Sequence, residues 1–246
     1  MIDQIRVIDQ PRAIDQAAVL AALDTVRDPE LDEPVTALGF VSSCTVSADG
    51  DVQVRLRLPT YFCAPNFAFL MVADAFDAVS RVNGVRHAEV VLDDHFASEE
   101  INRGVAARAG FVQSFDGLAE AELDTLRSDF IRKAVLAGTD RVCRPLLADG
   151  RTPEELAGLT LADAPPSADR TRLQERRAEL GLPSSPESPL LVDAVTGAAV
   201  AAAALPLHLG RARLTRVNIE ANAGVCRGML QHRYRTRGEG EMEEVR

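Results

Sequence analysis

The sequence predicts a mixed α/β (α+β) protein made of two parts. Residues 15–110 should form a small domain with the element order α-β-β-α-β, and residues 118–246 a mostly helical domain. Three observations predict this fold class. Short N-terminal segments alternate apolar and polar residues, as half-buried strands do. Longer segments repeat apolar residues at helical spacing, and turns rich in Gly, Pro and Asn separate the two kinds of segment.

In the N-terminal part, capping residues indicate where the helices begin and end. Asp15 is a good N-cap, and Pro29 should end the first helix, because the residue before a proline avoids the helical conformation. Pro65 suits the first position of a long amphipathic helix that Asn83 and Gly84 should close. The other expected elements are strands over 38–47, 51–58 and 85–92, with a hairpin turn at Asp49-Gly50, and a helix over 98–109.

The C-terminal part should consist of helices joined by Pro- and Ser-rich connectors. The expected elements are helices over 118–137 and 168–181, a short helix capped at Thr152, a hairpin over 190–200 turning at Thr196-Gly197, and one long helix over 205–234.

The last helix is rich in arginine. Residues 205–237 carry seven arginines and one acidic residue, Glu220, which gives a local charge of +6. This Arg-rich last helix is either simply solvated, or a docking face for an acidic partner or for the protein's own acidic N-terminal part.

Composition excludes several classes of partner. The chain has 27 basic and 37 acidic residues, a net charge of −10, with 4% aromatic residues and no tryptophan. Acidic charge disfavours phosphate binding and scarce aromatics disfavour base stacking, so we expect no nucleic acid partner. No apolar run approaches the ~20 residues of a membrane span, so we expect no membrane partner. The N-terminal residues lack the pattern of a secretory signal, which indicates a cytoplasmic protein.

Cys63 is the candidate metal ligand among four widely spaced cysteines, Cys44, Cys63, Cys143 and Cys226. Their spacing fits neither a zinc motif nor a small disulfide framework, so we expect thiols, with Cys44 structural in its strand. Cys63 follows a predicted strand and precedes the helix at Pro65. The positive end of a helix favours a thiolate, and thiolates bind iron–sulfur clusters and d-block metals. The alternative is that Cys63 is a small buried apolar residue.

Residues 15–95 resemble the MIP18-type domain, also called DUF59, of metal–sulfur cluster assembly factors. The matching segments are the first helix with the Asp28-Pro29-Glu30 loop, the strand after Ala37, the hairpin, the segment Pro59–Pro65 with Cys63, the long helix, and the strand over 85–92. Their order and spacing agree with the family. Three positions depart from it, since Phe62 replaces a Gly before the cysteine, Pro65 comes one residue late, and Ala37 replaces an Asp.

The resemblance implies a role in the assembly, carriage or delivery of iron–sulfur clusters to client proteins. It implies that Cys63 is the reactive cysteine and that Asp28 and Glu30 shape the neighbouring loop. One cysteine cannot hold a cluster alone, because ligation by four cysteines is usual. Either a homodimer shares two Cys63 thiols together with small thiols or another residue, or the C-terminal part brings Cys143 or Cys226 to Cys63.

Other chemistry is also open. His95 and Glu99, next to Asp93 and Asp94, could offer imidazole and carboxylate ligands to iron, although helix capping explains these acids equally well. A Cys63–His95 pair could act as a catalytic dyad. However, the sequence has no nucleophile-elbow, dinucleotide-binding or zinc-protease motif, so we predict that the protein is not an enzyme.

The sequence therefore predicts a maturation factor that assembles or delivers iron or an iron–sulfur cluster to a client metalloenzyme. Cys63 would be the transfer ligand, and the large appended domain favours a dedicated client, for which a component of a bacterial multicomponent oxygenase is preferred. The alternative is an adaptor or chaperone that binds no metal and stabilises an oxygenase subunit through its domain surface and Arg-rich last helix.

Overall fold

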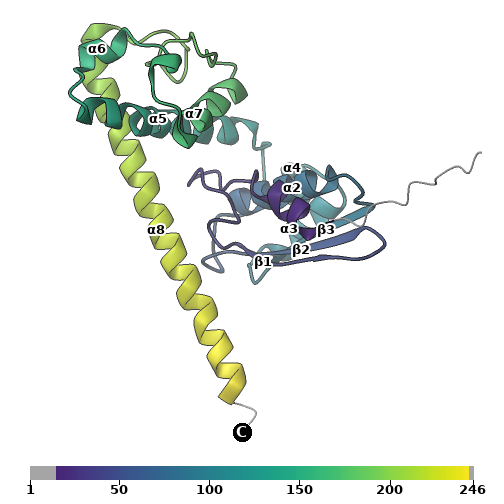
Figure 1. The fold of residues 1–246 in the computed structure, drawn as a ribbon. Helices are drawn as coiled ribbons and strands as arrows, with labels where there is room; N and C mark the ends of the chain where they lie inside the picture. Colours follow the sequence, from purple (N-terminus) through teal and green to yellow (C-terminus); the bar gives the residue numbers. More distant parts are fainter. Residues whose placement is uncertain (1–14, 244–246) are drawn as a thin grey trace, which may run out of the picture. The chain divides into compact units, whose positions relative to one another are not determined.

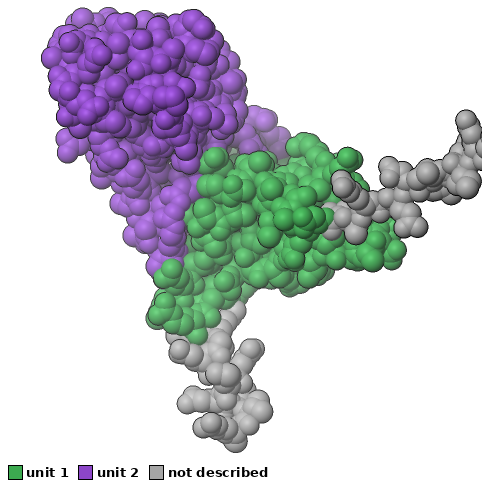
Figure 2. Space-filling model, in the orientation of Figure 1, with its two compact units in different colours: residues 1–27, 34–121, 230–246 green, residues 28–33, 122–229 purple. Residues whose placement is uncertain are grey.

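A computed structural model of the chain describes the backbone of residues 15–243 and the side chains of residues 15–235. This part of the chain divides into two compact units (Figure 2). Unit 1 contains residues 15–27, 34–121 and 230–243, and unit 2 contains residues 28–33 and 122–229. The domains expected from the sequence, 15–110 and 118–246, stay a prediction.

Unit 1 is a three-stranded sheet with helices packed on one face (Figure 1). The strands are β1 (Val41–Val46), β2 (Asp51–Arg57) and β3 (His87–Asp93), in that spatial order. β1 and β2 are antiparallel, whereas β2 and β3 are parallel. The helices are α1 (Gln16–Leu23), α2 (Pro65–Ser80), α3 (Ser98–Ala106) and the one-turn α4 (Phe111–Ser114). The predicted α/β class and the order α-β-β-α-β are confirmed.

The core of unit 1 lies between the sheet and α2. Val52, Val54 and Leu56 of β2 are at most 1% exposed, and the residues between them face solvent. The apolar stripe of α2 covers them, with Val72 and Ala75 completely buried. The strand alternation and the helical stripe seen in the sequence therefore meet as one apolar interface, whose burial is the main term that stabilises the unit.

The first helix ends earlier than the sequence predicts. The Asp15 carboxylate caps α1 as expected, accepting a hydrogen bond from a first-turn N–H at 3.0 Å. However, α1 ends at Leu23, well before Pro29. The chain leaves the helix there because the Val26 carbonyl accepts a hydrogen bond from the Val35 N–H at 2.9 Å, which closes a loop over residues 28–33.

The hairpin between β1 and β2 depends on a glycine. Gly50 has φ +89°, and a Cβ at this position would lie 2.8 Å from the carbonyl oxygen of Gly84. The predicted turn is therefore confirmed, and only glycine fits it. Gly84 also has a positive φ of +94°, as expected, although α2 itself already ends at Ser80.

Unit 2 is built on α5 (Asp124–Ala148), which packs against α7 (Ala168–Glu179). The short helix α6 (Pro153–Ala157) and the 3-10 turns η1 (Leu161–Asp163) and η2 (Ala202–Ala204) lie in the connections. The last helix, α8 (Leu205–Glu243), has 39 residues, of which 205–229 belong to unit 2 (Figure 1). Within the described residues, no helix is long and apolar enough to cross a membrane.

Two elements of unit 2 differ from the prediction. α5 begins at Asp124 instead of residue 118. It ends at Ala148 instead of residue 137, because buried residues continue its apolar face on both sides of Pro145. Cys143, which lies beyond the predicted end of this helix, is therefore inside α5. The predicted hairpin over 190–200 is reduced to a single bridge between Val192 and Ala199.

The predicted N-cap Thr152 of α6 is confirmed, and the structure adds that it forms a capping box with Glu155. The Thr152 hydroxyl accepts a hydrogen bond from the Glu155 N–H at 3.2 Å, and the Glu155 carboxylate accepts one from the Thr152 N–H at 2.8 Å. This reciprocal pair satisfies two N–H groups that would otherwise lack a partner at the helix start.

Candidate functional site

Cys63 lies in the loop between β2 and α2, as the sequence predicts. Its thiol is partly exposed, and its Sγ lies 3.3 Å from the Thr60 hydroxyl, within hydrogen-bonding distance. α2 begins at Pro65, and its N-cap Ala64 offers no side-chain hydrogen bond to the first turn. The thiol thus sits one residue before the positive end of a helix whose cap residue does not cover it.

The parallel pairing of β2 and β3 explains which loops meet at Cys63. Arg57 and Asp93, at the ends of these strands, lie side by side in the register. The chain therefore leaves both strands at the same edge of the sheet, and the loop after β3 runs beside the loop that carries Cys63. The Phe96 N–H donates a hydrogen bond to the Tyr61 carbonyl at 3.1 Å, which joins the two loops directly.

His95 holds the Cys63 loop through the backbone. It is 3% exposed, its Nδ1 accepts a hydrogen bond from the Ala97 N–H at 3.2 Å, and its Nε2 donates to the Cys63 carbonyl oxygen at 2.7 Å. Burial lowers the pKa of His95, against the hydrogen bond to Cys63, which raises it. The imidazole is therefore neutral at pH 7, with its proton on Nε2.

This geometry corrects two alternatives drawn from the sequence. The Cys63–His95 dyad considered as an alternative is not formed, because Nε2 contacts the carbonyl of Cys63 and the thiol contacts Thr60. The alternative imidazole–carboxylate iron site is also not formed. Both His95 nitrogens are engaged, Asp93 pairs with Arg55, and among the described residues no three His, Cys, Asp or Glu side chains group as a metal site.

The last helix contributes a clamp to the same two loops. Arg233 Nη1 donates to the Leu58 carbonyl at 3.0 Å and Nη2 to the Asp94 carbonyl at 2.6 Å, and the guanidinium also pairs with the Asp94 carboxylate at 2.8 Å. The neighbouring Tyr234 hydroxyl donates to that carboxylate at 3.4 Å, and the Tyr234 ring lies 4.5 Å from the guanidinium carbon of Arg57. We call Arg233 and Tyr234 the α8 clamp.

Three exposed aromatic side chains surround the Cys63 loop. Tyr61, Phe62 and Phe96 are 45%, 77% and 48% exposed. Their ring centroids lie 5.1 to 6.3 Å apart, so they contact one another as a cluster. Exposed aromatic clusters are uncommon on solvated surfaces and are enriched in protein interfaces. We call these three residues the aromatic rim.

Asp28 and Glu30, the other predicted site residues, lie in unit 2. The Asp28 carboxylate accepts hydrogen bonds from the N–H groups of Glu30 at 2.9 Å and Leu31 at 2.8 Å, so Asp28 shapes this loop. Burial raises the pKa of Asp28 to about 6, against the two hydrogen bonds, which lower it.

Arginines of unit 2 hold the acidic residues of this loop. Asp32 pairs with Arg176 of α7 at 2.7 Å, and Glu33 pairs with Arg227 of α8. Arg227 of the Arg-rich helix thus contacts one of the protein's own acidic residues, whereas the use of this helix as a docking face stays a prediction.

The other cysteines lie in different environments. Cys143 is 1% exposed in the core of unit 2, and burial raises the pKa of its thiol to about 12, so it is a poor ligand in the folded protein. Cys44 is buried in β1, and burial raises its pKa as well. Cys226 is partly buried on α8, in unit 2. Its use as a ligand stays a prediction.

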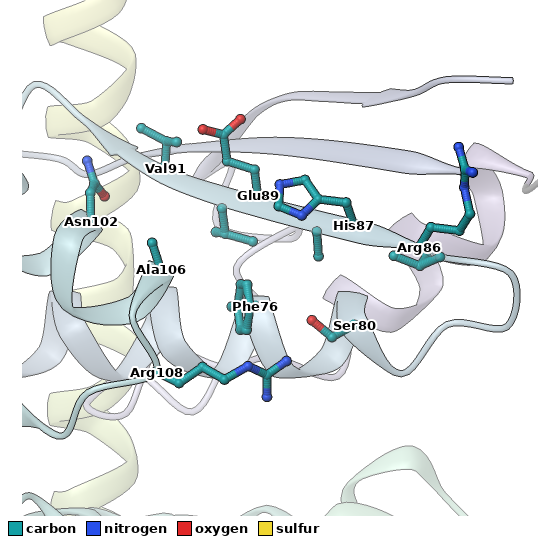
Figure 3. Close-up of a pocket in the computed structure, with 12 residues that line it drawn as sticks. Phe76, Ser80, Arg86, His87, Glu89, Val91, Asn102, Ala106 and Arg108 are labelled. Carbon is teal, nitrogen blue, oxygen red and sulfur yellow. The ribbon is translucent and has the colours of Figure 1, made fainter. Parts of the chain in front are cut away.

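A pocket of about 460 Å³ opens in unit 1 between α2, β3 and α3 (Figure 3). Phe76 from α2 and Asn102 from α3 line it, and the guanidinium carbon of Arg108 lies 5.0 Å from the Phe76 ring. Asn102 closes the edge of β3, since its side chain accepts from the Leu92 N–H at 2.8 Å and donates to the Leu92 carbonyl at 3.1 Å. None of the lining residues comes from the Cys63 loop.

Comparisons with known proteins bear on the N-terminal part of the chain. The family model described as iron-sulfur cluster assembly protein matches residues 16–91, which include β1, β2, α2 and Cys63. An uncharacterized protein of Methanocaldococcus jannaschii, MJ1129, is 31% identical over 84 residues, covering 34% of this chain and 86% of that protein. No solved structure gives a significant match. The chain therefore belongs, through its N-terminal part, to the iron–sulfur cluster assembly protein family, and the resemblance to MIP18-type domains is confirmed.

Proposed function

We propose that the protein assembles or carries iron or an iron–sulfur cluster and delivers it to a client metalloenzyme, with Cys63 as the transfer ligand. The observation that carries the proposal is the position of the Cys63 thiol, partly exposed at the start of α2 within the segment that matches the family. Family membership supports the general role in cluster assembly. The choice of ligand, cargo and client is our own inference.

The donor set suits a transient cargo. Among the described residues around Cys63, its thiol is the group that can bind a metal. The two nitrogens of His95 and the carboxylate of Asp94 are already engaged in the contacts above. A cluster held by this thiol takes its remaining ligands from a small thiol, a second copy of the chain or the client. Ligands supplied by the client would exchange during delivery, which is what a transfer protein requires.

Rigid support of the loop fits this role. His95 and the α8 clamp hold the Cys63 loop through backbone carbonyls and leave the thiol itself unencumbered except for Thr60. A ligand on a fixed backbone needs little reorganisation when a metal arrives. The aromatic rim beside it would dock the client, and a component of a multicomponent oxygenase in the cytoplasm is the client we would test first, a choice that rests on the family resemblance alone.

Anaerobic reconstitution tests the proposal. The purified protein is incubated with iron and sulfide, and visible charge-transfer absorption is compared between the wild type, Cys63→Ser and the control Cys44→Ala, at a thiol buried in β1. We expect absorption in the wild type and control and its loss in Cys63→Ser. Equal absorption in all three proteins, or none in any, would contradict Cys63 as the ligand.

A second function, adaptor or chaperone without metal, is favoured by one observation, the exposed aromatic rim. Such a surface can bind a protein whether or not Cys63 carries a cargo. In that case Phe62→Ser would weaken client binding and Cys63→Ser would leave both client binding and client activity unchanged.

A further inference from the structure

α8 has two opposite apolar faces over the part that belongs to unit 2. One face is buried, with Ala212, Ile219 and Ala223 at most 6% exposed. At 100° per residue, the opposite side of the helix carries a second apolar row, whose members are Leu207, Gly210, Leu214, Ala221, Val225 and Gly228. All six are exposed, and Leu207, Leu214 and Val225 are 60%, 61% and 60% exposed. We call this row the outer face of α8.

The outer face has the properties of a helix–helix interface. From Leu207 to Gly228 it extends about 32 Å along the helix axis. No charged residue lies on it, because the nearest charges, Arg211, Arg213 and Glu220, project from its two sides. Between Leu214 and Ala221, the exposed residues Val217 and Asn218 flank its midline, so one polar amide borders the centre of the row. A solvated helix normally carries polar residues opposite its buried stripe. An uncharged, mainly apolar row of this length on the surface is typical of a protein interface.

The size pattern of the outer face is complementary to itself. If a second copy lies antiparallel with Leu214 opposite Ala221 of the partner subunit, then Leu207 comes opposite the partner's Gly228. Gly210 comes opposite the partner's Val225. Each large side chain then meets a small residue, as close packing of facing helices requires. A Cβ added at Gly210 or Gly228 would meet nothing within 4 Å in this chain, so the space is open for the incoming side chain.

The charges beside the outer face favour the same arrangement. Arg213 and Glu220 project from one side, and Arg211 from the other. In an antiparallel pair, like sides meet, and Arg213 lies within about 3 Å along the axis of Glu220 of the partner subunit. A parallel pair would instead bring Arg213 beside the partner's Arg211, and it would stack leucine on leucine and glycine on glycine. Glu220 already pairs with Arg216 and Arg141 of its own chain, so Arg213 of the partner subunit would join an existing ion-pair cluster. Packing, together with the avoidance of Arg213 beside Arg211, favours the antiparallel pair.

We propose that the protein forms a twofold symmetric homodimer through the outer face of α8, with the two helices antiparallel. The contact is isologous, so it closes at two copies and leaves no exposed apolar row. This inference does not depend on Cys63 or on metal. It adds to the proposed function that each particle would carry two Cys63 thiols.

Mass measurement of the full chain tests the dimer. We expect light scattering at micromolar concentration to give twice the 26.5 kDa of one chain. Leu214→Glu should weaken self-association at least ~100-fold, because each dimer loses two apolar contacts and gains two unpaired charges. Val225→Glu should weaken self-association for the same reason. The control Leu118→Glu, at a side chain 85% exposed in unit 1, should leave the dimer intact. A monomeric wild type, or a dimer insensitive to both outer-face variants, would overturn the proposal.

Cysteine crosslinking tests the direction of the helices. The double variant Leu214→Cys/Ala221→Cys should form a covalent dimer on mild oxidation, and neither single variant should do so. The wild type, treated alike, reports any link formed by the native cysteines. Efficient crosslinking of Leu214→Cys alone would mean parallel helices and would overturn the antiparallel pairing. If the wild type is monomeric but binds a designed amphipathic helix with acidic sides, the outer face is a site for another protein and the homodimer is wrong.

Discussion

Replacement of Arg233 by alanine should loosen the Cys63 loop without unfolding the protein. The guanidinium donates to the carbonyls of Leu58 and Asp94 at 3.0 and 2.6 Å, and its side chain is 17% exposed. A hydrogen bond from a charged donor contributes about 1.5–3 kcal/mol, and the carbonyls partly recover water in the variant. We therefore expect the local opening free energy of these loops to fall by about 2–4 kcal/mol.

Amide hydrogen exchange measures this loss directly. Exchange in residues 58–64 and 94–97 should accelerate roughly 30- to 1,000-fold in Arg233→Ala, because 1.4 kcal/mol corresponds to a factor of ten. Site-resolved alkylation of Cys63 should accelerate with it. The control Arg235→Ala, at an exposed position two residues away, should change neither rate. Unchanged exchange in both loops would refute the idea that α8 holds the thiol loop.

Three further outcomes follow from particular contacts. Burial raises the pKa of Asp28 to about 6 from 3.8, so folded-state stability should fall by up to about 3 kcal/mol as the pH rises from about 4 to 6. Asp28→Asn keeps an oxygen for both hydrogen bonds and should abolish this fall in thermal unfolding; a wild type that gains stability over this range would contradict the assignment. Gly104→Ala places a Cβ 1.9 Å from the Ser114 hydroxyl, so it should lower the free energy of unfolding in denaturant by about 1–3 kcal/mol. The control Gly158→Ala, whose Cβ would have its nearest contact at 3.6 Å, should lower it by less than about 1 kcal/mol. Phe62→Ser should change the free energy of unfolding by less than about 0.5 kcal/mol, yet it should slow delivery of the cargo to the client. Equal delivery rates for the wild type and Phe62→Ser would show that the aromatic rim does not dock the client.

Elements with strong local signals could be predicted from the sequence. The caps at Asp15 and Thr152, the start of α2 at Pro65 and the turn at Gly50 each depend on residues within a few positions of one another. The position of Cys63 between a strand and a helix is equally local, so it was predicted correctly. Such features are set by backbone geometry and hydrogen bonds that a short segment makes with itself.

The contacts that support the site could not be predicted in the same way. Arg233 bonds to Leu58 and Asp94, which are 175 and 139 residues away in the chain. The sequence does not indicate which of the seven arginines in the last helix bonds to these carbonyls, because the choice depends on tertiary packing. His95 was likewise considered as a metal ligand or a base, whereas the structure uses both of its nitrogens to hold backbone groups.

The aromatic rim had a signal in the sequence that was not used. Tyr61 and Phe62 directly precede Cys63 in a chain with only 4% aromatic residues. Adjacent large aromatics in a loop cannot both be buried easily, so their exposure could have been inferred. The contribution of Phe96 required the parallel pairing of β2 and β3, which brings the two loops together.

The most direct test of the central claim is the iron and acid-labile sulfide content of protein isolated from cells without exposure to air. We expect iron in the wild type and in Cys44→Ala, and its loss in Cys63→Ser with an unchanged thermal unfolding curve. Iron retained at the wild-type level in Cys63→Ser would contradict the account, since no other thiol has been placed at the start of α2.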